Sequence, residues 1–361
     1  MAWLRSLIVS IAIPALSVSL SFLVASMVIL LSGHDPMSAF SGLFQGAIGD
    51  LEAVGRTLEK ATPLIWNGLA LTLAFKSGLF NIGVQGQFLL GALFSAVVGT
   101  FAWKIPAPLH LVAAIGGGVL AGALYGMIQG VLKAYREAHE VITGIMFNYI
   151  AINLTDYLTK GPFMDRAADN LIPRTPMVVD GCRMPEFASI PMTFLLAIIT
   201  SLCLFVFLET TVKGFEIRAI GEGVKAARSV MGLRIPWMMM SVMILSGALA
   251  GAGGAMESLG VTGRFQPGFN LGLGFEGITI ALLARGNPLG VIPAAILLGA
   301  MKAGASAMQF ASDVPTEMID MMISMILLCV AAEKLTMFLL PFKKTSQSTP
   351  SLGGGWGGGR R

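Results

Sequence analysis

The segment Leu109–Leu132 reads LHLVAAIGGGVLAGALYGMIQGVL and contains no Asp, Glu, Lys or Arg. A helix of about 20 apolar residues is long enough to cross the hydrocarbon core of a bilayer. Similar runs recur along the chain, in which 55% of the 361 residues are hydrophobic and only 12% are charged. Soluble domains carry about 25% charged residues. The composition excludes an ordinary soluble enzyme and predicts an all-α integral membrane protein.

Ten apolar segments are predicted, so we expect a polytopic protein with about ten transmembrane segments. The first segment is longer than the 7–15-residue core of a signal peptide, which predicts a retained span. The transmembrane domain is expected to cover residues 1–340, followed by a flexible, Gly-rich cytoplasmic tail over 341–361. The ten segments are Leu7–Leu31, Pro63–Phe75, Leu79–Trp103, Leu109–Leu132, Val141–Leu158, Ile190–Leu208, Met238–Met256, Phe269–Ala284, Pro288–Phe310 and Met318–Leu340.

Three polar segments separate these runs. Pro36–Lys60 has apolar residues near helical spacing with charges between them, which predicts one helix on the membrane surface. Placing the N-terminus inside puts more Lys and Arg in the inner loops than in the outer ones. Cytoplasmic loops carry such an excess, so both termini are predicted to be cytoplasmic. Residues 160–189 then form an external loop, and residues 210–236 form a cytoplasmic segment. The net charge of +4 has the same origin and does not indicate nucleic-acid binding.

Small residues recur at four-residue spacing on two of the segments. Gly118, Gly122, Gly126 and Gly130 share one helix face, and a ridge that includes Ser246 and Gly254 has the same spacing. Such faces let a neighbouring backbone approach closely. The pattern favours packing within the chain over an interface between subunits.

Polar residues at membrane depth are candidates for a solute path, because they need a partner or a cavity. Asn81, Gln85 and Gln87 cluster in a stretch whose glycines allow a helix to break. Asn148 and Glu276 interrupt two other segments. For each single residue, a bond to a neighbouring helix is as good an interpretation as contact with solute. The cluster of Asn81, Gln85 and Gln87 favours the solute path, because three amides within seven residues exceed what packing needs.

Sequence patterns of catalysis are sparse. The chain has no phosphate-binding loop of the form G-x-x-x-x-G-K-[ST], and His139 lacks a second histidine at helical spacing. Its three cysteines do not suggest a disulfide framework or a metal cluster. We therefore predict no catalytic residues, no metal site and no enzyme activity in this chain.

The basic segment Thr210–Pro236 contains Ala226-Ala227 between two glycines. The charge and residue spacing of this segment fit two interpretations equally well: an ordinary cytoplasmic loop, or a helix that docks a soluble partner.

Several motifs resemble one transporter family. Gly78–Gln87 reads GLFNIGVQGQ and resembles the signature GLFNIGAEGQ of ABC-importer permeases of the nucleoside and simple-sugar group, in the larger family of ribose and branched-chain amino acid permeases. The resemblance extends from about Pro36 to Leu340. Further matches are Ala61–Ile65, Glu140–Ala151, Ser246–Gly251 and Gly277–Gly290.

The resemblance implies a docking segment for an ATPase subunit. The family's pattern Gly-Glu-Asn-Pro-x-Ala-Ala matches here at Gly221-Glu222 and Ala226-Ala227, with Arg228 next, while Gly223-Val224 replace Asn-Pro. In the signature, Val84-Gln85 replace Ala-Glu, so an amide stands where the family has a carboxylate.

The function implied is that of the permease subunit of an ATP-driven importer in a bacterial plasma membrane, with nucleosides as the preferred solute. Its implied partners are an ABC ATPase that binds Mg-ATP, a second identical or homologous permease, an external solute-binding protein and membrane lipid. No cofactor is expected on this chain. Simple sugars or other small polar solutes remain the alternative. A second alternative, from a different class of transporter, is an ion-coupled secondary transporter. Three acidic residues within the apolar segments could support ion coupling: Glu257, Glu276 and Asp320.

Overall fold

The computed structural model describes residues 2–101, 106–166, 172–187, 190–223, 227, 232, 234–269 and 271–331. The predicted tail 341–361, and with it Ala226 and Arg228 of the docking segment, lie outside these residues. Within them the protein is all-α, as predicted, apart from one short hairpin. The α-helices are α1 Ala2–Leu31, α2 Pro36–Ile48, α3 Leu51–Lys76, α4 Val84–Thr100, α5 Ala107–Arg136, α6 Glu140–Lys160, α7 Met192–Thr210, α8 Val212–Glu222, α10 Ile235–Glu257, α11 Leu273–Leu283, α12 Pro288–Ser312 and α13 Glu317–Ala331.

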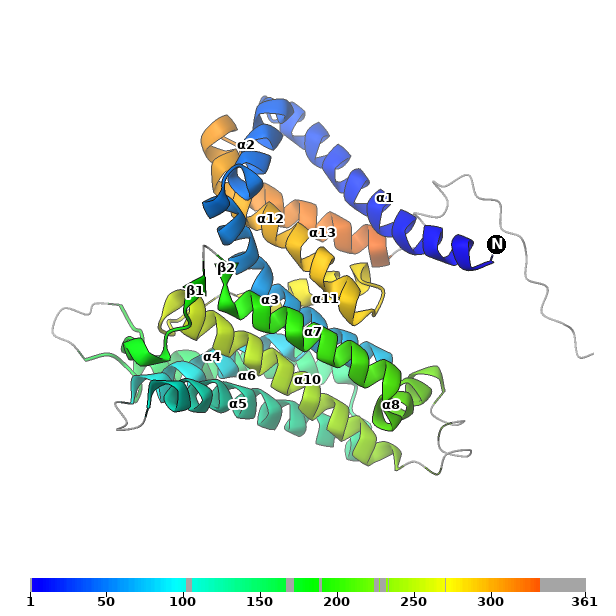
Figure 1. Ribbon diagram of the computed structural model, residues 1–361, viewed down its shortest axis with the longest axis vertical. Coiled ribbons are helices and arrows are strands. Elements are labelled where there is room, and N and C mark those ends of the chain that lie inside the picture. Colours follow the sequence, from blue (N-terminus) through cyan, green and yellow to red (C-terminus); the bar gives the residue numbers. More distant parts are fainter. Residues whose placement is uncertain are drawn as a thin grey trace, which may run out of the picture.

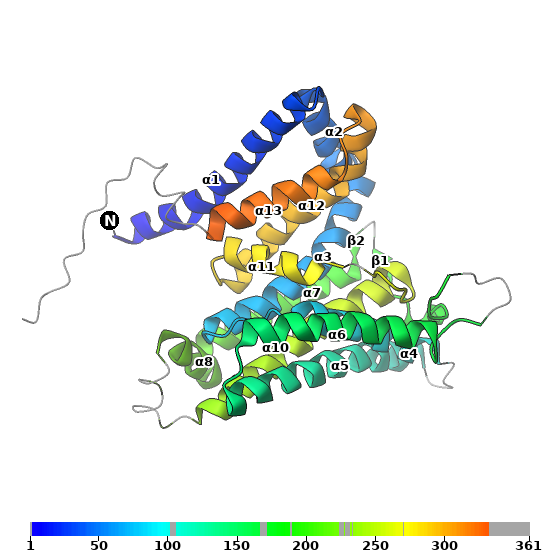
Figure 2. The same cartoon turned by 180° about the vertical axis from the view of Figure 1, so that it is seen from behind.

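The helices form two packed groups joined by α3. In Figures 1 and 2, α4, α5, α6 and α10 run side by side, while α1, α2, α12 and α13 gather on the other side of α3. Helix α7 packs against α3 and α12. Helix α3 packs against α10 in the first group and α12 in the second. Every residue from Ala61 to Ala74 of α3 is buried, as is every residue from Val84 to Leu93 of α4. Helices that are apolar on all sides belong in a protein interior, so α3 and α4 form the centre.

The glycine face of α5 packs within the chain, as predicted. A Cβ on Gly122 would lie 2.3 Å from the carbonyl oxygen of Gly247 on α10, and one on Gly126 would lie 2.4 Å from that of Met243. Real Cβ atoms do not approach other atoms so closely, so only glycine fits. The backbones of α5 and α10 are therefore in direct contact.

The prediction of one surface helix over Pro36–Lys60 is wrong. Helix α2 ends before Gly49, and Asp50 begins α3, because its Oδ1 accepts a hydrogen bond of 2.6 Å from the Ala53 amide. Helix α3 then continues without interruption through Pro63 to Lys76. Helix α2 packs against α12, where a Cβ on Gly46 would lie 2.5 Å from the Ala307 Cβ. Small residues on both helices therefore allow α2 to pack closely on α12.

The predicted external loop is folded where the structure describes it. It contains a 3₁₀ turn, Asp180–Cys182, and the antiparallel hairpin of β1, Glu186–Phe187, and β2, Ile190–Pro191. The Val179 amide donates to the Gly99 carbonyl at 3.0 Å, and the Val178 amide to the Gly263 carbonyl at 2.9 Å. The loop therefore covers the ends of α4 and of the π-helical extension of α10, Ser258–Thr262.

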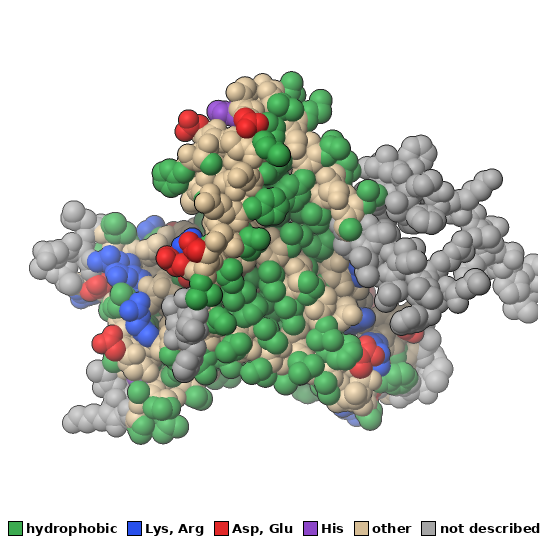
Figure 3. All heavy atoms as spheres, turned by 45° about the horizontal axis from the view of Figure 1, so that its top comes forward, with side chains coloured by type: hydrophobic (Ala, Val, Ile, Leu, Met, Phe, Trp, Pro, Cys, Tyr) green, Lys and Arg blue, Asp and Glu red, His purple; other side chains and the backbone are tan. Residues whose placement is uncertain are grey.

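The surface suits a membrane. Among the described helices, α5, α7, α10 with its extension, and α12 are long and apolar enough to cross a bilayer, and α1, α4 and α11 contain shorter apolar helices. The predicted number of about ten spans is therefore approximate. In Figure 3, hydrophobic side chains cover the middle of the visible face, and many charged side chains gather toward its left and right edges. Large apolar side chains such as Leu120, Leu124 and Ile128 on α5 are exposed, as expected for contact with lipid.

Candidate functional site

The predicted helix break lies between α3 and α4. Ser77 ends α3, and Gly78 adopts a φ of +74°, a conformation that favours glycine. Residues 79–83 then cross the interior before α4 begins at Val84. This irregular backbone is largely buried, so its polar groups need hydrogen-bond partners within the protein.

Two of the predicted amides, Asn81 and Gln87, form a buried polar network. The Asn81 Nδ2 donates to Gln87 Oε1 at 2.9 Å and to Ser246 Oγ of α10 at 2.8 Å. The Gln87 Nε2 donates to Gln129 Oε1 of α5 at 2.9 Å. Ser246 Oγ in turn donates to the Ala70 carbonyl of α3 at 2.7 Å. The network therefore ties α3, α4, α5 and α10 together.

Asn148 and Gln85 bind backbone groups beside this network. The Asn148 Nδ2 donates to the Ile82 carbonyl at 2.9 Å, and its Oδ1 accepts from the Gly86 amide at 2.8 Å. The Gln85 Oε1 accepts from the Gly274 amide at the start of α11, at 2.6 Å. Helices α6 and α11 are thus attached to the first turn of α4.

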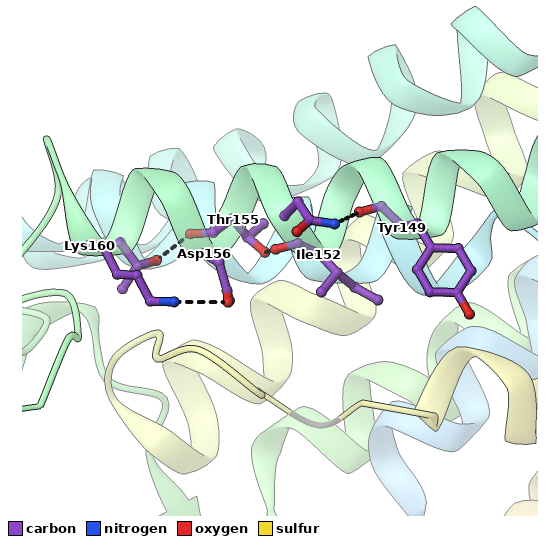
Figure 4. A network of polar contacts seen from close by, with 7 residues as sticks. Tyr149, Ile152, Thr155, Asp156 and Lys160 are labelled. Carbon is purple, nitrogen blue, oxygen red and sulfur yellow. Dashed lines mark hydrogen bonds and ion pairs between the residues drawn. The ribbon is translucent and has the colours of Figure 1, made fainter.

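Glu140 of α6 pairs with Lys133 of α5, whereas several other polar side chains of α6 bond only along their own helix. In Figure 4, Lys160 reaches Asp156, with 3.4 Å between Nζ and Oδ2, and Thr155 donates to the Ile152 carbonyl. The Asn153 Nδ2 donates to the Tyr149 carbonyl at 2.8 Å. These bonds stabilise α6 and involve no second helix.

Glu276, in the first turn of α11, takes part in an ion network with two other residues. Its Oε1 is 2.8 Å from Lys302 Nζ of α12, which is 3.8 Å from Asp320 Oδ1 of α13. The Glu276 side chain is 16% exposed and that of Asp320 is 71% exposed, so the network runs from the interior to the surface. Sequence reasoning missed the pairing, although a lysine within an apolar segment was a signal for it.

The predicted docking segment includes α8, a short helix after α7. Thr211 caps its start by accepting a 3.0 Å bond from the Gly214 amide. Gly221 and Glu222 at its end are exposed, whereas Ala227 is buried in this chain. Of the described docking residues, Gly221 and Glu222 are thus the ones accessible to a partner.

The structure does not gather the candidate residues into one site. Asn81, Gln85, Gln87 and Asn148 surround the helix break, Glu276 lies in the ion network, and α8 lies at one end of the helices (Figure 1). No group of three or more His, Cys, Asp or Glu side chains suited to a metal ion occurs within the described ranges. The described residues thus form close helix contacts, a helix break and an exposed helix at one end. Such features suit a protein that changes conformation.

Comparison with known proteins identifies the family of this chain. Residues 54–331 match the family described as branched-chain amino acid transport system / permease component. The chain belongs to this family. It is 36% identical over 340 residues to the guanosine ABC transporter permease protein NupP of Bacillus subtilis, covering 91% of this chain and 95% of that protein.

Two further relatives also align along most of the permease. The nucleoside ABC transporter permease protein NupB of Lactococcus lactis is 28% identical over 93% of this chain and 95% of its own length. A glucose ABC transporter permease protein of Haloferax volcanii is 32% identical over 87% of this chain and 85% of its own length. The protein is thus a multi-pass membrane permease of an ABC importer, and such subunits are not themselves catalytic.

Proposed function

We propose that the permease imports nucleosides. The main support for this proposal is that the guanosine and nucleoside permeases named above align with more than nine tenths of this chain. The glucose permease aligns nearly as fully, which makes a simple sugar the second candidate.

The proposed orientation places both termini on the cytoplasmic side of a bacterial plasma membrane. In Figures 1 and 2, α8 and the N-terminal end of α1 point to one side of the molecule, and the β1–β2 hairpin lies toward the other. The excess of Lys and Arg in the predicted inner loops supports assigning the α8 side to the cytoplasm.

The proposed partners follow from this orientation. An ABC ATPase docks on α8 from inside and hydrolyses Mg-ATP, so this chain performs no covalent chemistry and carries no cofactor. A second permease, identical or homologous, completes the membrane pair, and a binding protein delivers solute from outside. The exposed positions of Glu222 and Phe215 on α8 support the first contact.

The candidate residues of the solute path differ in their hydrogen-bond partners. Asn81, Gln85, Gln87 and Asn148 bind protein groups in this conformation, so contact with solute would require them to exchange partners. Glu276 needs no such exchange, because its Oε2 has no hydrogen-bond partner among the described residues. We therefore place Glu276 on the path and assign the amides to the conformational change that opens it.

Uptake of labelled nucleoside, ribose and leucine tests the substrate. Cells without their own uptake systems would produce the permease with its ATPase and binding protein. We expect nucleoside uptake that excess ribose and leucine do not inhibit. Ribose uptake alone would favour the second candidate, and leucine uptake alone would refute both.

A further inference from the structure

A groove of about 510 Å³ lies between α7 and α10, beside α8. Helix α7 packs mainly on α3, α8 and α12, and α8 also touches α10, so α8 closes one end of the groove (Figure 1). The volume falls within the roughly 300–1,000 Å³ of typical ligand pockets. The lining residues include Phe207, Lys213, Arg234, Trp237, Val242 and Leu245.

The groove is polar at the α8 end and apolar along α10. Lys213 of α8 and Arg234, the residue before α10, lie at the polar end. Val242 and Leu245 line the apolar part, and Leu245 lies about two turns beyond Trp237, or about 12 Å along the helix axis. A phospholipid has the same order of polarity, from a charged headgroup to an apolar chain.

The apolar part of the groove opens onto the lipid-facing surface. Leu245 lines it and is 43% exposed, and Val206 of α7, next to the lining residue Phe207, is 46% exposed. Trp237 also lines the groove and is 60% exposed. Tryptophan is enriched where the hydrocarbon core meets the headgroups, so Trp237 marks the depth expected for a lipid headgroup.

The charge at the α8 end favours an anion. Lys213 and Arg234 against Glu216 give the lining a net charge of +1. The Lys213 Nζ lies 2.8 Å from Glu216 Oε2, whereas Arg234 is exposed and forms no ion pair with another residue that the structure describes. Arg234 also precedes the N-terminus of α10, where the helix dipole favours negative charge. A guanidinium can bind a phosphate through two parallel hydrogen bonds.

We propose that this groove binds an anionic phospholipid of the cytoplasmic leaflet, with the phosphate on Arg234 and an acyl chain along Val242 and Leu245. Basic pockets between transmembrane helices on the cytoplasmic side suit the headgroups of anionic lipids. A lipid seated here contacts α7, α8 and α10 together, and therefore holds the docking helix against the other two. The proposal goes beyond solute transport and uses the proposed orientation only to name the leaflet.

Native mass spectrometry of the purified permease complex, titrated separately with phosphatidylglycerol and phosphatidylcholine, tests the proposal. We expect phosphatidylglycerol to bind more tightly than phosphatidylcholine. Arg234→Gln should weaken phosphatidylglycerol binding about fivefold and leave phosphatidylcholine binding unchanged. The matched control is Arg136→Gln, because Arg136 is exposed at the end of α5 on the same side of the molecule and does not line the groove. Equal phosphatidylglycerol affinity in the two variants would overturn the proposal.

Ser241→Phe gives a second readout by filling the groove from α10. Ser241 lines the groove, and its Oγ donates to the Trp237 carbonyl of its own helix at 2.8 Å. We expect the complex to retain one phosphatidylglycerol fewer, while its thermal unfolding midpoint in lipid-free detergent does not fall. Ser324→Phe on α13 is the control, since Ser324 is exposed and also bonds to its own helix. An unchanged number of bound phosphatidylglycerol molecules in Ser241→Phe would contradict the site.

A protein in this groove would give different results. If the ATPase occupies it, Arg234→Gln lowers recovery of the ATPase and leaves phosphatidylglycerol binding unchanged. If a second permease occupies it, Ser241→Phe lowers recovery of the permease pair, again with unchanged phosphatidylglycerol binding. Either result overturns the proposal. None of these measurements requires a transported solute, so a failure of the proposed nucleoside function is distinguished from a failure of the lipid site.

Discussion

The backbone of Gly221 on α8 packs directly against the carbonyl group of Lys76, the last residue of α3. A Cβ on Gly221 would lie 2.2 Å from that oxygen, and a Cβ on Gly78 would lie 3.3 Å from the Gly221 Cα. The docking helix therefore touches the turn that opens the helix break before Asn81. Because backbone meets backbone, a displacement of α8 reaches the break without passing through flexible side chains.

Gly221→Val should uncouple transport from ATP hydrolysis. The added side chain must displace either α8 or the Lys76 turn, since the space at this contact does not admit even a Cβ. We expect the variant to insert and to retain its ATPase partner, but to lose at least about tenfold in nucleoside uptake. Normal uptake would show that this contact does not transmit motion.

The substitution Glu222→Lys tests the docking of the ATPase separately from the transmission of motion through the Gly221–Lys76 contact. Glu222 is exposed beside Gly221 and does not contribute to the buried face of α8. A reversed charge there should weaken co-purification of the ATPase and leave the stability of the permease unchanged. Glu52→Lys on the first turn of α3, also exposed, provides the same charge change as a control. Equal ATPase recovery from both variants would remove Glu222 from the docking surface.

Gly122→Leu should destabilise the permease by separating α5 from α10. Its Cβ would lie 2.3 Å from the Gly247 carbonyl oxygen, and overpacking of this kind costs about 1–3 kcal/mol or more. Thermal unfolding of the purified protein measures the effect. Gly116→Ala on the same helix is the control, because a Cβ there meets nothing within 4 Å. Equal stability of the two variants would contradict the direct backbone contact.

Gln85→Leu and Gln85→Glu distinguish a structural acceptor from a solute contact. Leucine leaves the Gly274 amide unpaired, which costs about 1–3 kcal/mol, whereas glutamate keeps an oxygen acceptor. We expect Gln85→Leu to lower nucleoside uptake about tenfold and Gln85→Glu to retain most of it. Unchanged uptake in Gln85→Leu would take this residue out of the mechanism altogether.

Cysteine labelling tests the orientation. A membrane-impermeant maleimide should label Asp180→Cys in intact cells, and Glu222→Cys only after permeabilisation. Both positions are exposed, and α8 and the β1–β2 hairpin that follows Asp180 lie toward opposite sides of the molecule (Figure 1). Cys203 is exposed and is replaced by serine for the assay. Burial raises the pKa of the Cys182 thiol, which keeps it protonated and slow to react. The reverse labelling pattern would invert the proposed topology.

Local features that depend on a single steric property of glycine could be predicted from the sequence. Four-residue spacing of Gly118 to Gly130 predicted close helix packing, and the glycines near Asn81 predicted the break before α4. The division of Pro36–Lys60 was missed, because amphipathic spacing is the same for a helix on a membrane and for a helix packed on α12. The cap at Asp50 was the local signal for it.

Long-range partners could not be predicted from one sequence. Spacing does not reveal that Ser246 bonds to Asn81, 165 residues earlier, or that Gln129 completes the network. The burial of the Asn67 amide without a hydrogen-bond partner among the described residues was also missed, because only the fold reveals which groups surround it.

ATP-dependent accumulation of guanosine in proteoliposomes tests the central claim most directly. The vesicles would contain the permease, its ATPase and any second permease, with Mg-ATP on the α8 side and the binding protein on the other. We expect accumulation that requires Mg-ATP and binding protein, persists when ion gradients are collapsed, and is not inhibited by excess leucine. Guanosine uptake that proceeds without ATP and stops when ion gradients collapse would contradict it.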